Sequence, residues 1–204
     1  MEPTAKQALS TSLEKLVTNM SFDDISVKLI VSKTTFNRQT FYYHFQDKFD
    51  CLQYTLEQLS QRLAAEMIYS DWRKCYLKIF NVIAQRRTFM GHIVDSQAYS
   101  MFTDFVLQSV DAMLQGVLAR TPQGEAQTSF PQKPWKLFEY GLQGIIIDWF
   151  TEGLRKEPEE LVDELLDVDI SQLKVLLKVL LGTQKQNLQR QNLPRQLPAT
   201  ARLR

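Results

Sequence analysis

The sequence predicts an all-α protein, and two observations lead to that fold class. The 204 residues include only 7 glycines and 7 prolines, the two residue types that most often interrupt a helix. Between them, apolar residues recur at the spacing of about 3.6 that is typical of a helix with one buried face. The hydrophobic content of 44% is ordinary for a globular protein, and the length allows one large domain or two small ones.

Two helices are predicted at the N-terminus. The first spans Ala5–Asn19, and the second runs from Val27 to about Lys33. Ser26 directly precedes the second helix and is placed to cap its free amides. The apolar positions expected to face inward are Leu9, Leu13, Leu16 and Val17 in the first helix, and Val27, Ile30 and Val31 in the second.

A third short helix follows a break at Thr34–Phe36, with Asn37 as its N-cap. Phe41 and Phe45 are four residues apart and therefore share the buried side of this helix. Tyr42 and Tyr43 are adjacent, so at least one of them is exposed. The polar or aromatic side chains at the exposed start are Arg38, Gln39, Thr40 and Tyr43. A helix that enters the major groove of DNA by its N-terminal end needs side chains of this kind.

The charge is unevenly distributed along the chain. Residues 26–48 carry four positive charges, on Lys28, Lys33, Arg38 and Lys48, against one negative charge on Asp47, a net of +3. Residues 157–169 carry seven acidic residues and no basic residue. A locally basic segment on a nearly neutral chain favours a modest, salt-sensitive attraction to DNA.

Further helices are expected after residue 48. One runs from Asp47 to about Ile68, the spans 72–86 and 89–119 supply more, and the last two cover residues 135–156 and 158–181, with a kink near Asp167–Asp169. The segment Thr121–Pro134 is predicted to be a loop, and the polar stretch from Gly182 a disordered tail that either attracts DNA weakly or only aids solubility. The helix over residues 135–150 is apolar nearly all round, and Leu173–Leu181 is a second apolar stripe. Both are expected to pair with their copies in a two-fold dimer.

The N-terminal segment resembles the DNA-binding helix-turn-helix of the TetR family of transcription regulators. The resemblance covers roughly Leu9 to Leu52, and its specific part is the run Thr40–Phe45 followed by Asp47-Lys48. It implies a helix-turn-helix head (residues 1–48), a larger helical regulatory and dimerisation body (residues 49–182) and a tail (residues 183–204). It also implies DNA-contacting residues, in which we include the cap Ser26: Thr40, Tyr42, His44 and Lys48 hold phosphates, and Asn37, Arg38, Gln39 and Tyr43 face the groove.

The chain departs from the family at the turn. The family usually has Ala-Gly where this chain has Thr34-Thr35. Threonine is a poor residue for a left-handed conformation. The turn is therefore expected either to be built differently or to carry strain.

No set of residues for catalysis or metal binding stands out. His44 and His92 lack a metal-ligand partner at helical spacing, and Cys51 and Cys75 show no redox or metal motif. They are expected to be thiols packed on helices. No enzyme activity, cofactor or metal is predicted. The N-terminus has no signal-like apolar core and no segment has the ~20 apolar residues of a membrane span, so a cytoplasmic protein is expected.

The second half resembles a subgroup of the family, the regulators of dihydroxyacetone-kinase operons. The residues that carry this likeness are Trp72–Lys74, Tyr140–Trp149, Glu152–Leu154 and Pro158–Leu161. It implies an activator that is switched by contact with a protein related to the dihydroxyacetone-binding kinase subunit. The alternative is a repressor released by an apolar effector held among the body aromatics, although each of these rings is more often a core residue. A helical interaction protein that no longer binds DNA is a further alternative.

Overall fold

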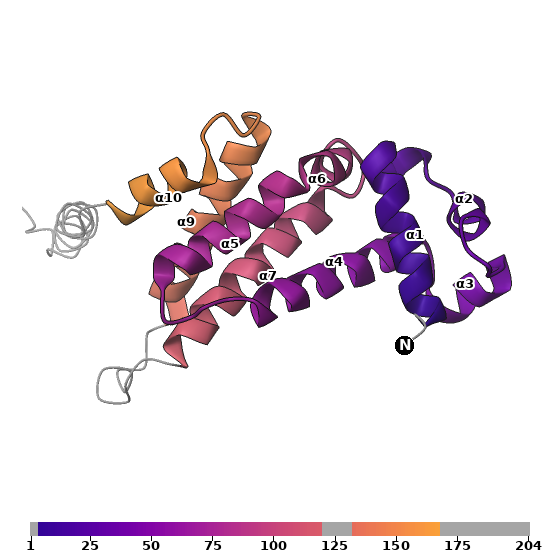
Figure 1. The fold of residues 1–204 in the computed structure, drawn as a ribbon, viewed down its shortest axis with the longest axis horizontal. Helices are drawn as coiled ribbons and strands as arrows, with labels where there is room; N and C mark the ends of the chain where they lie inside the picture. Colours follow the sequence, from indigo (N-terminus) through magenta and orange to yellow (C-terminus); the bar gives the residue numbers. More distant parts are fainter. Residues whose placement is uncertain (1–3, 120–131, 168–204) are drawn as a thin grey trace, which may run out of the picture. The chain divides into compact units, whose positions relative to one another are not determined.

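The computed structural model describes residues 4–119 and 132–167, and within these ranges all regular structure is helical, which confirms the all-α prediction. The elements in chain order are α1 (Ala5–Asn19), the 3-10 turn η1 (Phe22–Asp24), α2 (Val27–Ser32), α3 (Arg38–His44), α4 (Lys48–Ala65), α5 (Trp72–Gln85), α6 (Arg87–Val94), α7 (Tyr99–Leu118), α9 (Gln132–Thr151) and α10 (Pro158–Leu166) (Figure 1). Residues 1–162 form one compact unit, and the rest of the chain is assigned to a second.

Helix α1 is the element on which the N-terminal half is assembled. It packs against α2 and α3 within the head and against α4 and α6 of the body (Figure 1). Leu9, Leu13 and Val17 are fully buried, as predicted, whereas Leu16 is half-buried. The Ser12 hydroxyl donates to the Ile30 carbonyl at 2.7 Å, which fixes α2 against α1.

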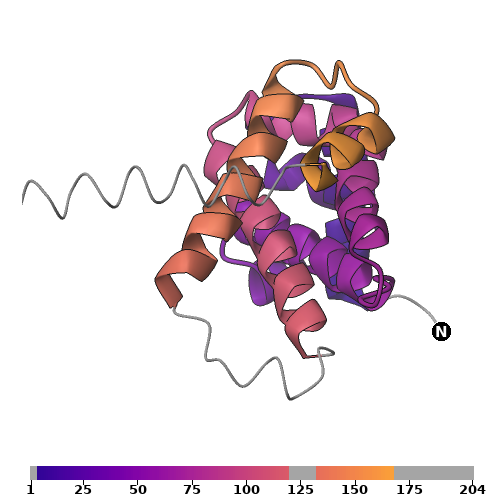
Figure 2. The same cartoon turned by 90° about the vertical axis from the view of Figure 1, so that its left-hand side faces the viewer.

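The body is built around α7. This helix packs against α4, α5 and α6, and also against α9, which lies beside it in the turned view (Figure 2). Its buried rings meet those of α9, with Phe102 and Phe150 centroids 5.0 Å apart. Phe80 of α5 lies edge-on to Trp149 at 5.0 Å. These aromatic side chains therefore pack as core.

Several helix boundaries follow the sequence signals closely. Helix α1 begins and ends at the predicted residues, with Thr4 forming a capping box with Gln7. Ser26 and Asn37 cap α2 and α3. Asp47 lies just outside α4, where its carboxylate accepts from the amides of the first turn.

Other boundaries differ from the prediction. The span 89–119 holds the end of α6 and all of α7, because the Ser96 hydroxyl donates to the Ile93 carbonyl and accepts from the Ala98 amide. Helix α9 begins inside the predicted loop, at Gln132, which leaves Pro134 in the first turn, where proline is tolerated.

Helix α9 ends at Thr151, earlier than the predicted Lys156. Gly153 and Leu154 have φ values of 91° and 56°, and the Leu154 amide donates back to the Trp149 carbonyl. Such a left-handed C-terminal cap stops a helix. The rest of the predicted loop, the continuation of the last helix with its kink and Leu173–Leu181 stripe, and the tail lie outside the described residues.

Candidate nucleic-acid interface

The short helix α3 presents two faces of opposite character. Phe41 and Phe45 are 0% and 2% exposed, and their ring centroids lie 5.5 Å apart in the core of the head. On the opposite side, Tyr42 and Tyr43 are 58% and 84% exposed. The prediction that at least one of the two tyrosines is exposed is confirmed for both.

The exposed face of α3 carries the chemistry that base edges and phosphates need. Arg38 and Gln39 are exposed in the first turn, and Gln39 precedes Tyr43 by one helical turn on the same stripe. The Asn37 side chain accepts from the Thr40 amide at 2.9 Å, and the Thr40 hydroxyl donates to the same oxygen at 3.2 Å. The Asn37 amide nitrogen can still donate to a base or a phosphate.

The N-terminal end of α2 is a second polar region of the head. The Ser26 hydroxyl oxygen accepts from the Leu29 amide at 3.3 Å, and its proton can be donated outward. Lys28 is exposed in the first turn of α2 and Lys33 at its end. These two lysines count towards the basic charge of the head, although the sequence motif assigns them no contact.

The turn between α2 and α3 is built by a side chain. The Thr34 hydroxyl donates to the Val31 carbonyl at 3.0 Å and accepts from the Phe36 amide at 3.2 Å. Leu154 is the one non-glycine residue with a positive φ in the described part of the chain. The turn therefore needs no left-handed residue. Of the two expected alternatives, it is built differently from the Ala-Gly turn and does not contain a strained threonine.

Lys48 is held within the head. Its ammonium group donates to the carbonyls of Phe22 and Asp23 at 2.9 and 3.0 Å, and lies 4.6 Å from the centroid of the Phe22 ring. Lys48 thus ties the start of α4 to η1. A phosphate contact from Lys48 stays a prediction, and a phosphate would have to share the ammonium with these two carbonyls.

His44 lies at the C-terminal end of α3 and is half-buried. Its ring stands edge-on to that of Tyr43, with centroids 5.0 Å apart. This contact places the imidazole beside the exposed aromatic face of α3.

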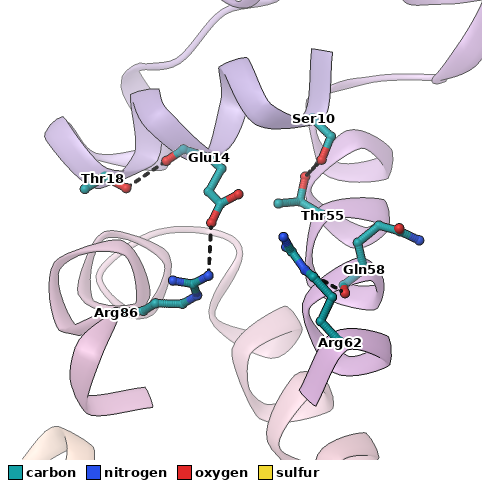
Figure 3. A network of polar contacts seen from close by, with 7 residues as sticks. All are labelled: Ser10, Glu14, Thr18, Thr55, Gln58, Arg62 and Arg86. Atoms are coloured by element: carbon teal, nitrogen blue, oxygen red, sulfur yellow. Dashed lines mark hydrogen bonds and ion pairs between the residues drawn. The ribbon is translucent and has the colours of Figure 1, made fainter. Parts of the chain in front are cut away.

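Three polar contacts join the head to α6 and its flanks, and no sequence motif indicated them. The His92 Nδ1–H donates to the Val17 carbonyl at 2.6 Å, which satisfies one of the last carbonyls of α1. The Gln97 amide donates to the Asp23 carboxylate at 3.2 Å. The Arg86 guanidinium lies 3.6 Å from the Glu14 carboxylate (Figure 3). The partners are more than 70 residues apart, beyond the reach of local patterns.

Outside the head, the described residues hold no group of three or more His, Cys, Asp and Glu that could bind a metal ion. Cys51 and Cys75 are buried thiols on α4 and α5, as expected. Burial raises the pKa of the Cys51 thiol to about 12, so it stays protonated at neutral pH. Within the described ranges, no helix has the length and apolar character to cross a membrane.

Comparison with known proteins agrees with this arrangement. Residues 70–168 match the family model TetR_C_8, described as a transcriptional regulator C-terminal region. No curated protein matches the chain. The chain thus joins a helix-turn-helix head to a segment that is similar to the C-terminal region of transcriptional regulators.

In its fold, the chain also resembles a solved structure. This is the dihydroxyacetone kinase operon activator DhaS, with a TM-score of 0.61 over 84% of this chain and 97% of that chain. The sequence identity is 18%, so the likeness establishes the shared fold.

The turn geometry gives a first testable prediction. Thr34→Val keeps the shape of the side chain but removes both hydrogen bonds of the hydroxyl, and should destabilise the protein by about 1–2 kcal/mol. Urea unfolding measures this. The matched variant Thr35→Val, at an exposed site, should change stability by less than about 0.5 kcal/mol. Equal effects would show that the Thr34 hydroxyl does not build the turn.

Proposed function

We propose that the protein is a dimeric, DNA-binding transcription regulator that reads its operator with α3. The observation that carries this proposal is the outward face of α3, where Arg38, Gln39 and Tyr43 project from a helix fixed by two buried phenylalanines. The basic charge of the head supports it. In this proposal residues 1–48 bind DNA, residues 49–182 regulate and dimerise, and residues 183–204 form a tail.

The proposed contacts fall into two groups. Ser26, Thr40, Tyr42, His44 and Lys48 hold phosphates and fix the position of the head on the duplex. Asn37, Arg38, Gln39 and Tyr43 face the base edges, where a glutamine or asparagine can pair with adenine and an arginine with guanine. The hydroxyl-built turn supports docking of α3 and weakens the case for a fold that has lost DNA binding.

Substitutions in the head test this division. Gln39→Ala or Tyr43→Ala should cost about 1–3 kcal/mol on the upstream intergenic DNA of the protein's own gene and change sequence preference. Lys48→Gln should weaken binding to every duplex and reduce the salt slope by about 1. Because Lys48 also ties α4 to η1, thermal unfolding is measured for each variant. Salt-dependent fluorescence titrations on operator and random duplexes provide the comparison.

The control for these variants is Gln115→Ala, an exposed glutamine of α7, which should bind like the wild type. Equal losses from Gln39, Tyr43 and Lys48 variants on operator and random DNA would contradict the division into base and phosphate contacts. A wild-type protein without any salt-dependent shift of its own upstream DNA would contradict DNA binding itself.

The dimer proposal rests on an uncovered apolar face of α9. Leu142, Ile146 and Trp149 are buried on one side of this helix, but Leu137, Tyr140 and Ile145 are 65%, 54% and 37% exposed. At Gly141 and Gly144 an added Cβ would meet open space, so another helix can approach there closely. An apolar face of this kind favours pairing with its copy across a two-fold axis.

Ile145→Glu should therefore weaken the dimer by at least about tenfold, because a carboxylate would be buried without a partner. Sedimentation at micromolar concentration measures the change. Ile68→Glu is the matched control, since Ile68 is 53% exposed but lies between α4 and α5. A wild-type monomer, or an operator without two half-sites roughly 34–36 Å apart or a little more, would contradict the proposal.

We further propose that the protein activates a dihydroxyacetone kinase operon through a kinase-like coactivator protein. The likeness to DhaS in fold and the subgroup residues of the second half support this. A pocket for so small and hydrophilic a ligand as dihydroxyacetone needs several buried donors and acceptors, since each unpaired hydroxyl costs about 1–3 kcal/mol. The core packing of Phe80, Phe102 and Trp149 favours this mechanism over release of a repressor by an apolar effector.

Calorimetry with dihydroxyacetone alone should give no binding to this chain. A pull-down with the dihydroxyacetone-binding kinase-like protein should succeed, and more strongly when dihydroxyacetone is present. Tight binding of the free small molecule would exclude the coactivator mechanism, and binding of an apolar effector that lowers DNA affinity would favour the repressor.

A further inference from the structure

A small cavity with an excess of positive charge lies where α4, α5 and the start of α6 meet. Its volume is about 260 Å³, and its walls carry Arg62, Lys78 and Arg86 against the single carboxylate of Glu66. These four side chains give it a net charge of +2. A concave site of that size and charge is suited to a small anion.

Arg86 is the least satisfied of the three cations. Its Nε is buried and has no hydrogen-bond partner among the described residues. The distance of 3.6 Å from Nη2 to the Glu14 carboxylate is longer than a normal hydrogen bond (Figure 3). A guanidinium has five N–H donors, and a buried donor without an acceptor is costly. The side chain as a whole is 34% exposed, so a ligand can reach the part of the guanidinium that is not buried.

The neighbouring groups add donors to the same cavity. Lys78 of α5 pairs with Glu66 just beyond the end of α4, and this hydrogen bond and charge hold the pKa of Glu66 below its ordinary value. The Arg62 Nε donates to the Gln58 carbonyl at 3.2 Å. The two terminal nitrogens of this guanidinium take no part in that hydrogen bond (Figure 3). Helix α6 begins beside Arg86 without a side-chain cap.

We propose that this cavity binds a small, multiply charged oxyanion of the phosphate class, with Arg86 as the principal ligand and Arg62 and Lys78 beside it. A phosphate group supplies several acceptor oxygens, and a guanidinium pairs with two of them at once. The anion supplies acceptors to the accessible part of the Arg86 guanidinium, whose ion pair with Glu14 is long.

Such an anion competes directly with Glu14 for Arg86. Glu14 is on α1, so occupancy of the cavity weakens one of the three polar contacts between the head and the segment around α6. The two others, from His92 and Gln97, do not involve the cavity. If the protein binds DNA as proposed above, an anion in this site changes how firmly α1, and with it α3, is held.

Calorimetric titration with inorganic phosphate tests binding in the full-length protein without DNA, at constant ionic strength set with sodium chloride. The wild type should show saturable binding. Arg86→Gln should reduce the affinity by at least about tenfold, through loss of a charged hydrogen-bond donor. The exposed Arg155→Gln should leave it unchanged. Glu14→Gln should increase the affinity, because the competing carboxylate is lost.

Circular dichroism checks that each variant is folded; should Arg86→Gln fail to fold, Arg62→Gln is expected to weaken binding instead. The proposal is overturned if phosphate produces no more heat than chloride, if Arg86→Gln binds phosphate like the wild type, or if folded Glu14→Gln binds it less tightly. Because no DNA is present, failure here leaves the proposed DNA binding intact, and failure to bind DNA leaves the anion site intact.

Discussion

The buried stripe of α1 is the interaction on which the N-terminal half of the protein depends. Leu9, Leu13 and Val17 have no exposed surface, and burial of each contributes about 1.5–3 kcal/mol. The helix that carries them touches α2 and α3 on one side and α4 and α6 on the other. One helix thus supplies core residues to both the head and the body. Because α3 packs on α1, a displacement of α1 also moves α3.

The polar contacts around α1 differ in kind from this apolar stripe. The Ser10 and Thr55 hydroxyls, 2.8 Å apart, are buried and fixed (Figure 3). The contacts from Glu14 and Asp23 are partly exposed, where ion pairs and hydrogen bonds are weak and easily exchanged. The apolar stripe determines that α1 stays in place, and the exchangeable contacts are suited to adjusting how firmly it is held.

Two surfaces with exposed aromatic or aliphatic side chains, one on α3 and one on α9, have different chemistry. Around Tyr43 on α3, aromatic rings alternate with hydrogen-bonding groups and positive charge, which suits a hydrated, anionic partner. Around Leu137 and Ile145 on α9, the exposed residues are apolar and two glycines leave room for another helix. The two faces therefore suit partners of different chemistry.

The sequence alone determined the helical class, three of the four predicted inward positions of α1, the caps Ser26 and Asn37, and the buried and exposed sides of α3. Each of these depends on residues within about four positions of one another, which is the range of helical periodicity and capping. The end of α9 is also encoded locally, by the left-handed cap at Gly153. The predicted end at Lys156 did not take this cap into account. Only the tertiary structure decided that the Thr34 hydroxyl closes the turn and that Lys48 is held by two carbonyls of η1. It alone brought Arg86 of the body to Glu14 of the head, because partners 72 residues apart meet only when the helices between them have packed.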